Sequence, residues 1–191
     1  GQDAVNAVEE LLNQGASAFV IDLRGNPGGL ATETRTFLDY LLPGGTLFET
    51  VDKAGNKVRY ESDNVCIKLP ICVLINAETH AEAEVFAAVM KEFQAASLLG
   101  EATTGDTRTQ STIEISDGSA MRLSTGSYLT ANGTDISKAG GVVPDRIVYN
   151  SDASATGTTS GTTGSSDGTG VNTNDEQLIA ALTMLSMTNV G

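Results

Sequence analysis

Short runs of apolar residues that alternate with amphipathic segments constrain this chain more than any other feature. Residues 18–21 and 71–75 are apolar at successive positions, which is typical of strands buried on both faces. Apolar residues also recur at helical spacing in 3–14, 30–42 and 82–95, so we expect a helix in each of these segments. Strands that alternate with helices predict an α/β fold in which helices cover a sheet.

Antiparallel pairing is expected in two shorter parts of the chain. Residues 47–51 and 57–60 flank a turn with the sequence DKAGN, which predicts a β-hairpin. Residues 112–115 and 120–124 flank an Asp-Gly pair and predict a second one. One more strand is expected at 97–99. The α/β core should therefore carry local hairpins.

Composition divides the chain into three parts. Residues 1–150 have the apolar content of one folded domain. Residues 151–174 are dominated by Ser, Thr, Gly, Asp and Asn, which predicts a flexible linker or loop. Residues 175–187 again show apolar side chains on one helical face, so we expect this helix to dock on the domain.

The charge of the chain excludes several classes of partner. The net charge is −13, from 24 acidic and 11 basic side chains, and such a surface repels nucleic acid and anionic membranes. No run approaches the length of a membrane-spanning helix. The two cysteines, Cys66 and Cys72, form neither a disulfide framework nor a zinc pattern, and no cofactor or metal site is predicted. We expect an extracytoplasmic protein.

Four segments, in order, match motifs of one peptidase family. They are 19–29 (FVIDLRGNPGG), 73–84 (VLINAETHAEAE), 98–110 (LLGEATTGDTRTQ) and 123–145, which contains LST, YLTANGTD and GVVPD. The chain thereby resembles the C-terminal processing (tail-specific) serine peptidases. The resemblance covers most of residues 3–150 and implies a ClpP/crotonase-like spiral α/β core. Members of this family usually also have a PDZ domain and a strand ahead of the first helix, and neither is present in these 191 residues.

The resemblance implies that two catalytic groups are replaced. The family's nucleophile is the middle serine of a Ser-Ala-Ser-Ala-Ser-Glu run, and the ungapped alignment places Ala81 there. Its lysine base corresponds to Asp106, and the separation of 25 residues (106 − 81) is the one that the family keeps. Gln110 matches the family's orienting glutamine. A methyl group cannot attack a carbonyl, so we expect the chain not to hydrolyse peptides.

An oxyanion hole could outlive these side chains because it consists of backbone amides. By the same resemblance it would use Gly28, Gly29 and the amide of Glu82. A simpler interpretation of the NPGG sequence is a tight turn between a strand and a helix, and both interpretations can hold together.

The residues around Ala81 leave other interpretations open. His80 and Glu84 are four apart and could share a helix face as metal ligands do, or they could belong to an acidic first helical turn with a surface histidine. Asp106 could activate a water molecule. Ala81 could be a natural loss or a laboratory substitution, although the second replacement at Asp106 favours natural loss.

Three functions follow from these alternatives. The first is a peptidase-like domain without peptidase activity that binds extended polypeptide or acts as a surface scaffold. The second is an active serine-type endopeptidase whose nucleophile is misassigned or was engineered away. The third is a metal-binding or structural domain built on the acidic cluster around His80.

Overall fold

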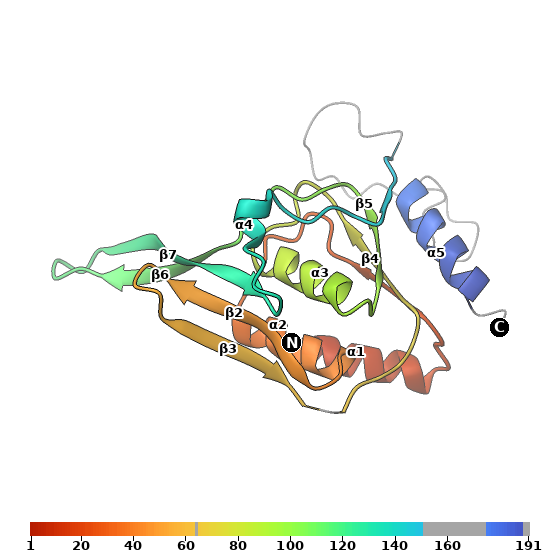
Figure 1. The fold of residues 1–191 in the computed structure, drawn as a ribbon. Helices are drawn as coiled ribbons and strands as arrows, with labels where there is room; N and C mark the ends of the chain where they lie inside the picture. The colour runs from red at the N-terminus through yellow and green to blue at the C-terminus, as the bar shows by residue number, and fades with distance from the viewer. Residues whose placement is uncertain (64, 151–174, 189–191) are drawn as a thin grey trace.

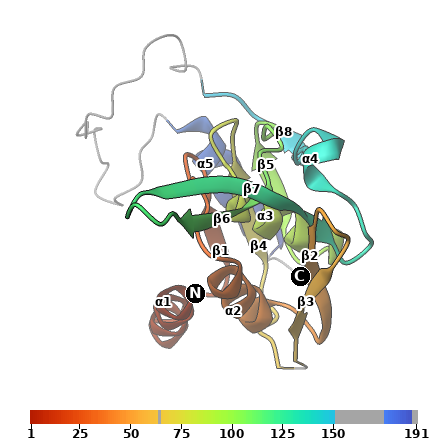
Figure 2. The ribbon, with the colours of Figure 1, turned by 90° about the vertical axis from the view of Figure 1, so that its left-hand side faces the viewer.

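A parallel sheet lies at the centre of the protein. A computed structural model describes residues 1–63, 65–150 and 175–188. The sheet contains β1 (Phe19–Asp22), β4 (Ile71–Ile75), β5 (Ser97–Gly100) and β8 (Arg146–Ile147) in the order β1-β4-β5-β8 (Figures 1 and 2). Neighbouring strands all pair in parallel. Of the two apolar runs predicted to be buried strands, 71–75 forms β4, and 18–21 corresponds to β1, which begins and ends one residue later.

Helices cover both faces of the parallel sheet, as the continuous apolar runs predict. Side chains of β4 alternate between two cores: Val73 and Ile75 pack with α2 (Ala31–Leu41) and α3 (Glu82–Glu92). Cys72 and Leu74 pack on the opposite side with α5 (Glu176–Thr188). The first helix, α1 (Gln2–Asn13), lies beside α2 (Figure 2).

The antiparallel part of the fold is larger than the sequence predicts. It is a four-stranded sheet of β2 (Gly45–Asp52), β3 (Lys57–Ser62), β7 (Ala120–Thr130) and β6 (Arg108–Glu114), in the order β3-β2-β7-β6. Pairing of β2 with β7 joins the two expected hairpins, and the β6–β7 hairpin projects beyond the rest of the domain (Figure 1). A short helix, α4 (Ile136–Ala139), follows β7.

Strand β6 begins earlier than predicted, at Arg108, and β7 ends later, at Thr130, because these inner halves lack apolar alternation. Thr, Ser and Gly are frequent in residues 108–111 and 125–130, yet both segments pair, with a shift of register between Thr109 and Gln110. Gly126 lies opposite Asp52, where an added Cβ would meet the carbonyl oxygen of Val51. The glycine therefore permits the close approach of β7 to β2. Despite these differences, the predicted α/β fold class is confirmed.

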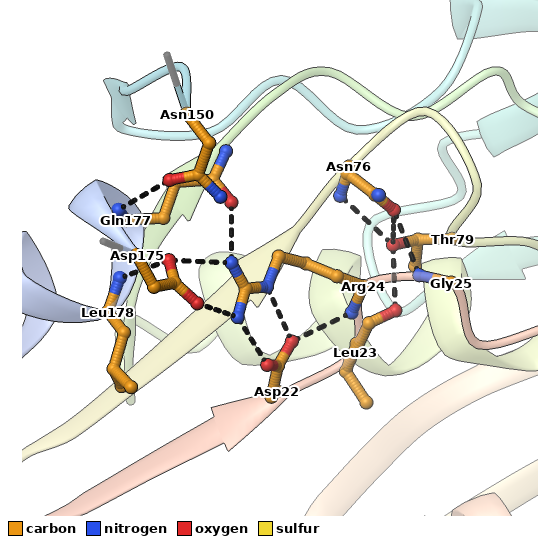
Figure 3. A network of polar contacts seen from close by, with 10 residues as sticks. All are labelled: Asp22, Leu23, Arg24, Gly25, Asn76, Thr79, Asn150, Asp175, Gln177 and Leu178. Carbon is orange, nitrogen blue, oxygen red and sulfur yellow. Dashed lines mark hydrogen bonds and ion pairs between the residues drawn. The ribbon is translucent and has the colours of Figure 1, made fainter. Parts of the chain in front are cut away.

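The C-terminal helix is anchored by a polar network at the end of β1. The guanidinium of Arg24 donates to both Asp22 (2.6 Å) and Asp175 (2.7 Å), and to Gln177 Oε1 at 2.9 Å (Figure 3). Asp175 also accepts the amide of Leu178 at 3.0 Å, which caps the first turn of α5. Arg24 is therefore bonded to a residue 151 positions further along the chain.

This network predicts a pH dependence of stability. Burial acts to raise the pKa of Asp175, but the hydrogen bonds from Arg24 and from the Leu178 amide outweigh it and hold this pKa below its ordinary value. A carboxyl whose pKa is lowered in the folded state stabilises the fold above its unfolded pKa, about 3.9. That stabilisation is lost as the pH falls through the folded pKa.

We therefore expect Asp175→Asn to lower the free energy of unfolding by about 1–2 kcal/mol at neutral pH, while keeping the cap. Urea unfolding of both chains at about pH 7 and about pH 3 measures the difference. The gap between wild type and variant should shrink at the lower pH. A gap that stays constant with pH would show that the charge of Asp175 contributes nothing.

Three further expectations concern the C-terminal helix, the predicted linker and the absence of a membrane-spanning helix. In the part of the chain that the structure describes, α5 packs on the parallel sheet through Ala181 and Leu185. The predicted flexible linker, residues 151–174, lies outside the described residues. Among the described helices, none combines the length and the apolar character that crossing a bilayer requires.

Candidate functional site

The turn between β4 and α3 holds Ala81 in a strained backbone conformation. Ala81 is the residue that precedes α3, with φ 50° and ψ −123°, a region that residues with a side chain rarely adopt. Thr79 holds the turn against the end of β1: its hydroxyl donates to the carbonyl of Leu23 at 2.8 Å and accepts the amide of Asn76 at 3.0 Å (Figure 3). Such strain is typical of positions where a side chain must be presented at a helix start.

The NPGG loop lies directly against this turn. The carbonyl of Asn26 accepts the amide of His80 at 2.9 Å, and its side-chain oxygen accepts the amide of Gly28 at 2.9 Å. Gly28 has φ +92°, and a Cβ added there would lie 2.7 Å from the Cβ of Ala81. Only glycine can therefore bring the loop this close to Ala81.

Asp106 reaches the same turn from the loop that follows β5. Its carbonyl accepts the amide of Ala81 at 3.0 Å. Its carboxylate turns toward solvent and pairs with Arg108 at 2.9 Å. Ala81, Asp106 and Gly28 thus come together at one place. Gln110 lies four residues further along, exposed on β6 and paired with Ser124.

Glu84 supports the Asp106 loop from the helix. Its side chain is fully buried, and one carboxylate oxygen accepts the amide of Gly105 at 2.7 Å. The other oxygen has no hydrogen-bond partner among the described residues. Glu84 therefore acts on the loop backbone, and its side chain does not face outward as part of an acidic surface turn.

His80 lies on the outer side of the same loop. Its Nδ1 is 3.4 Å from the hydroxyl of Thr104, a neighbour that no local sequence pattern indicates. Within residues 1–63, 65–150 and 175–188, no group of three or more His, Cys, Asp or Glu side chains comes close enough to hold a metal ion. The open question of a metal site at His80 and Glu84 therefore has no supporting geometry in these residues.

The side chain of Glu82 makes two hydrogen bonds that the sequence did not predict. One oxygen accepts the amide of Gly29 at 2.9 Å, and the other accepts the hydroxyl of Tyr128, on β7, at 2.6 Å. Burial, followed by the bond to the Glu82 carboxylate, raises the pKa of Tyr128. The carboxylate therefore joins the NPGG loop, α3 and the antiparallel sheet.

A cavity of about 230 Å³ opens beside these groups. Its lining includes Gly28, Gly29 and Glu82 as well as the apolar side chains of Leu30, Phe37 and Phe86. The rings of Phe37 and Phe86 stack at 5.3 Å.

The arrangement of the strained helix-start turn, the glycine loop and the loop after β5 defines a peptidase-type α/β domain. The profile of peptidase family S41 matches residues 1–148, and the chain belongs to this family. It is 32% identical over 148 residues to the "Carboxyl-terminal-processing protease" of Synechocystis sp.. The alignment covers 77% of this chain and 34% of that relative. The chain thus spans about a third of the length of that relative.

Solved structures agree with this assignment. A photosystem II D1 C-terminal processing protease aligns with a TM-score of 0.69 and 33% identity, over 76% of this chain and 38% of the other. A putative S41 protease from Bacteroides fragilis aligns with a TM-score of 0.70 over 98% of this chain and 49% of its own. Its identity is 19%, so this likeness shows the fold alone.

Proposed function

We propose that this chain is a C-terminal processing peptidase-like domain that binds extended polypeptide without cleaving it. One observation carries the proposal: the Ala81 turn keeps its strained backbone and its contact with Gly28, but the side chain presented there is a methyl group. The residue whose carbonyl touches that turn is Asp106, whose carboxylate points to Arg108. Neither position offers a hydroxyl that could attack a carbonyl, or a neutral amine that could take the proton from such a hydroxyl.

The cavity beside Gly29 supports the binding part of the proposal. Leu30 lines the cavity and is 66% exposed, so the cavity presents apolar surface that a ligand side chain would cover. A location outside the cytoplasm is part of the same proposal; it is supported by the acidic composition, with a net charge of −13, and cell fractionation would test it.

Binding can be tested with a fluorescently labelled unstructured peptide, by anisotropy, on three chains. We expect Leu30→Ser to weaken binding by about fivefold or more, because one apolar contact is worth about 1 kcal/mol. Val65→Ser is the matched control, since Val65 is 77% exposed and does not line the cavity. Equal affinity of the Leu30 and Val65 variants would place binding elsewhere.

A second function is favoured by one observation, the 3.4 Å approach of Thr104 to His80. A hydroxyl beside an imidazole is the arrangement of a nucleophile and its base. A fluorophosphonate probe distinguishes the two functions. Labelling of the wild-type chain that is lost in both Thr104→Val and His80→Ala would establish a hydrolase and refute the first proposal. Absence of labelling, together with intact peptide after long incubation, supports the first.

A further inference from the structure

The Glu82 side chain lines the cavity, beside Gly28 and Gly29. Its two oxygens take the amide of Gly29 and the hydroxyl of Tyr128, at 2.9 and 2.6 Å. The first of these donors belongs to the set that an oxyanion hole in this fold would use. Since an amide has one hydrogen, Gly29 cannot serve another acceptor while Glu82 holds it.

The surroundings favour a negative group at this point. Glu82 is the first residue of α3, where the helix dipole stabilises an anion, and both of its bonds are charge-assisted. A Cβ added to Gly28 would lie 2.7 Å from Oε2 of Glu82, the oxygen that accepts the Gly29 amide, so the loop lies close against the carboxylate. The pocket is therefore built around an anion, and that anion is part of the chain.

We propose that Glu82 is an internal ligand of this anion site and controls what the cavity binds. While its side chain is in place, carboxylates and carbonyl oxygens of a ligand are kept away from Gly29. A ligand that uses the amide must first displace the side chain, which lowers its apparent affinity by the fraction of time that the site is empty. This inference deepens the proposed function, since it concerns the same cavity.

Acetate tests the inference because it is the free equivalent of the Glu82 side chain. The readout is the amide resonance of Gly29 in ¹H–¹⁵N spectra of the whole chain. In wild type we expect no saturable response to acetate. In Glu82→Ala the resonance of the Gly29 amide proton should lie upfield of its wild-type position, because the acceptor is gone. Addition of acetate should shift this resonance back downfield. The apparent affinity for acetate should rise by about tenfold or more.

Two further variants make the result decisive. Glu114→Ala, on the projecting hairpin, changes the charge equally and should respond as wild type does. Tyr128→Phe keeps the carboxylate but removes one of its two donors, so its acetate response should be intermediate; it also serves if Glu82→Ala folds poorly. An equal acetate response in wild type and Glu82→Ala, or a Gly29 resonance that ignores the substitution, would overturn the inference.

The outcome does not depend on peptide binding. Acetate could occupy the vacated site in a chain that binds no polypeptide, which would retain this inference and refute the proposed function. Peptide binding that is equally strong in wild type and Glu82→Ala, with no acetate response in either chain, would support the proposed function and refute this inference.

Discussion

Replacing Ala81 by serine and Asp106 by lysine in the same chain should produce measurable hydrolysis of an unstructured peptide, at least about 100-fold above either single variant. The amide of Ala81 lies 3.0 Å from the carbonyl of Asp106, so the backbone already brings the two positions together. Arg108 pairs with Asp106 at present, and its like charge would lower the pKa of a lysine there and favour the neutral base.

The single variants are the controls for this prediction. Ala81→Ser alone gains a hydroxyl without a base, and Asp106→Lys alone gains a base without a nucleophile, so neither should exceed background. Initial rates with a fluorogenic peptide give the comparison. Adding Glu82→Ala to the double variant should raise the rate again, because it frees the amide of Gly29 for the oxyanion. A double variant as inactive as the single ones would show that Ala81 and Asp106 are not the nucleophile and base positions.

Gly28→Ala should destabilise the protein by about 3 kcal/mol, which for a chain of this size corresponds to about 6–12 °C in Tm. Alanine is strained at φ +92°, and its methyl group would lie 2.7 Å from the Cβ of Ala81 and 2.9 Å from the amide of Glu82. Because backbone atoms are involved, the loop has to move away from α3. Thermal unfolding followed by circular dichroism measures the effect.

The neighbouring glycine provides a matched control. A Cβ added at Gly29 meets no heavy atom within 4 Å, and Gly29 is not among the glycines with positive φ. Gly29→Ala should therefore change the free energy of unfolding by less than about 0.5 kcal/mol. If both variants lost the same stability, the close approach of Gly28 to Ala81 would not be the cause.

The sequence predicts the parts of the fold that local patterns determine. The apolar runs of β1 and β4 and the amphipathic faces of α1, α2 and α3 follow from burial on one or both sides. The pairing of β2 with β7 was not predicted, because it joins segments far apart in the chain through polar, Gly- and Thr-containing residues. Its register, Phe48 opposite Thr130, depends on tertiary contacts such as the approach of the Phe48 and Tyr128 rings, whose centroids lie 5.9 Å apart.

The candidate site shows the same division. The resemblance indicated Ala81, Asp106 and the NPGG loop, because these positions belong to ordered motifs. It gave no indication of the Tyr128 hydroxyl or the Thr104 hydroxyl as neighbours of Glu82 and His80. Those contacts join separate segments of the chain, and an acidic residue at a helix start is common for reasons of the dipole alone. Only the three-dimensional arrangement distinguishes a bound carboxylate from a solvated one.

Asn150 and Gln177 meet at the edge of the domain, where the amide of Gln177 donates to the Asn150 side chain at 3.1 Å. The side chain of Gln177 also donates to the carbonyl of Val148 at 2.7 Å, so the residues on either side of 151–174 lie next to each other. The entropy of closing a connection grows only logarithmically, by about 0.6 kcal/mol for each doubling of its length. This point of the surface is therefore suited to accept an inserted module or affinity tag, and a circularly permuted chain could be opened there without separating α5 from its sheet.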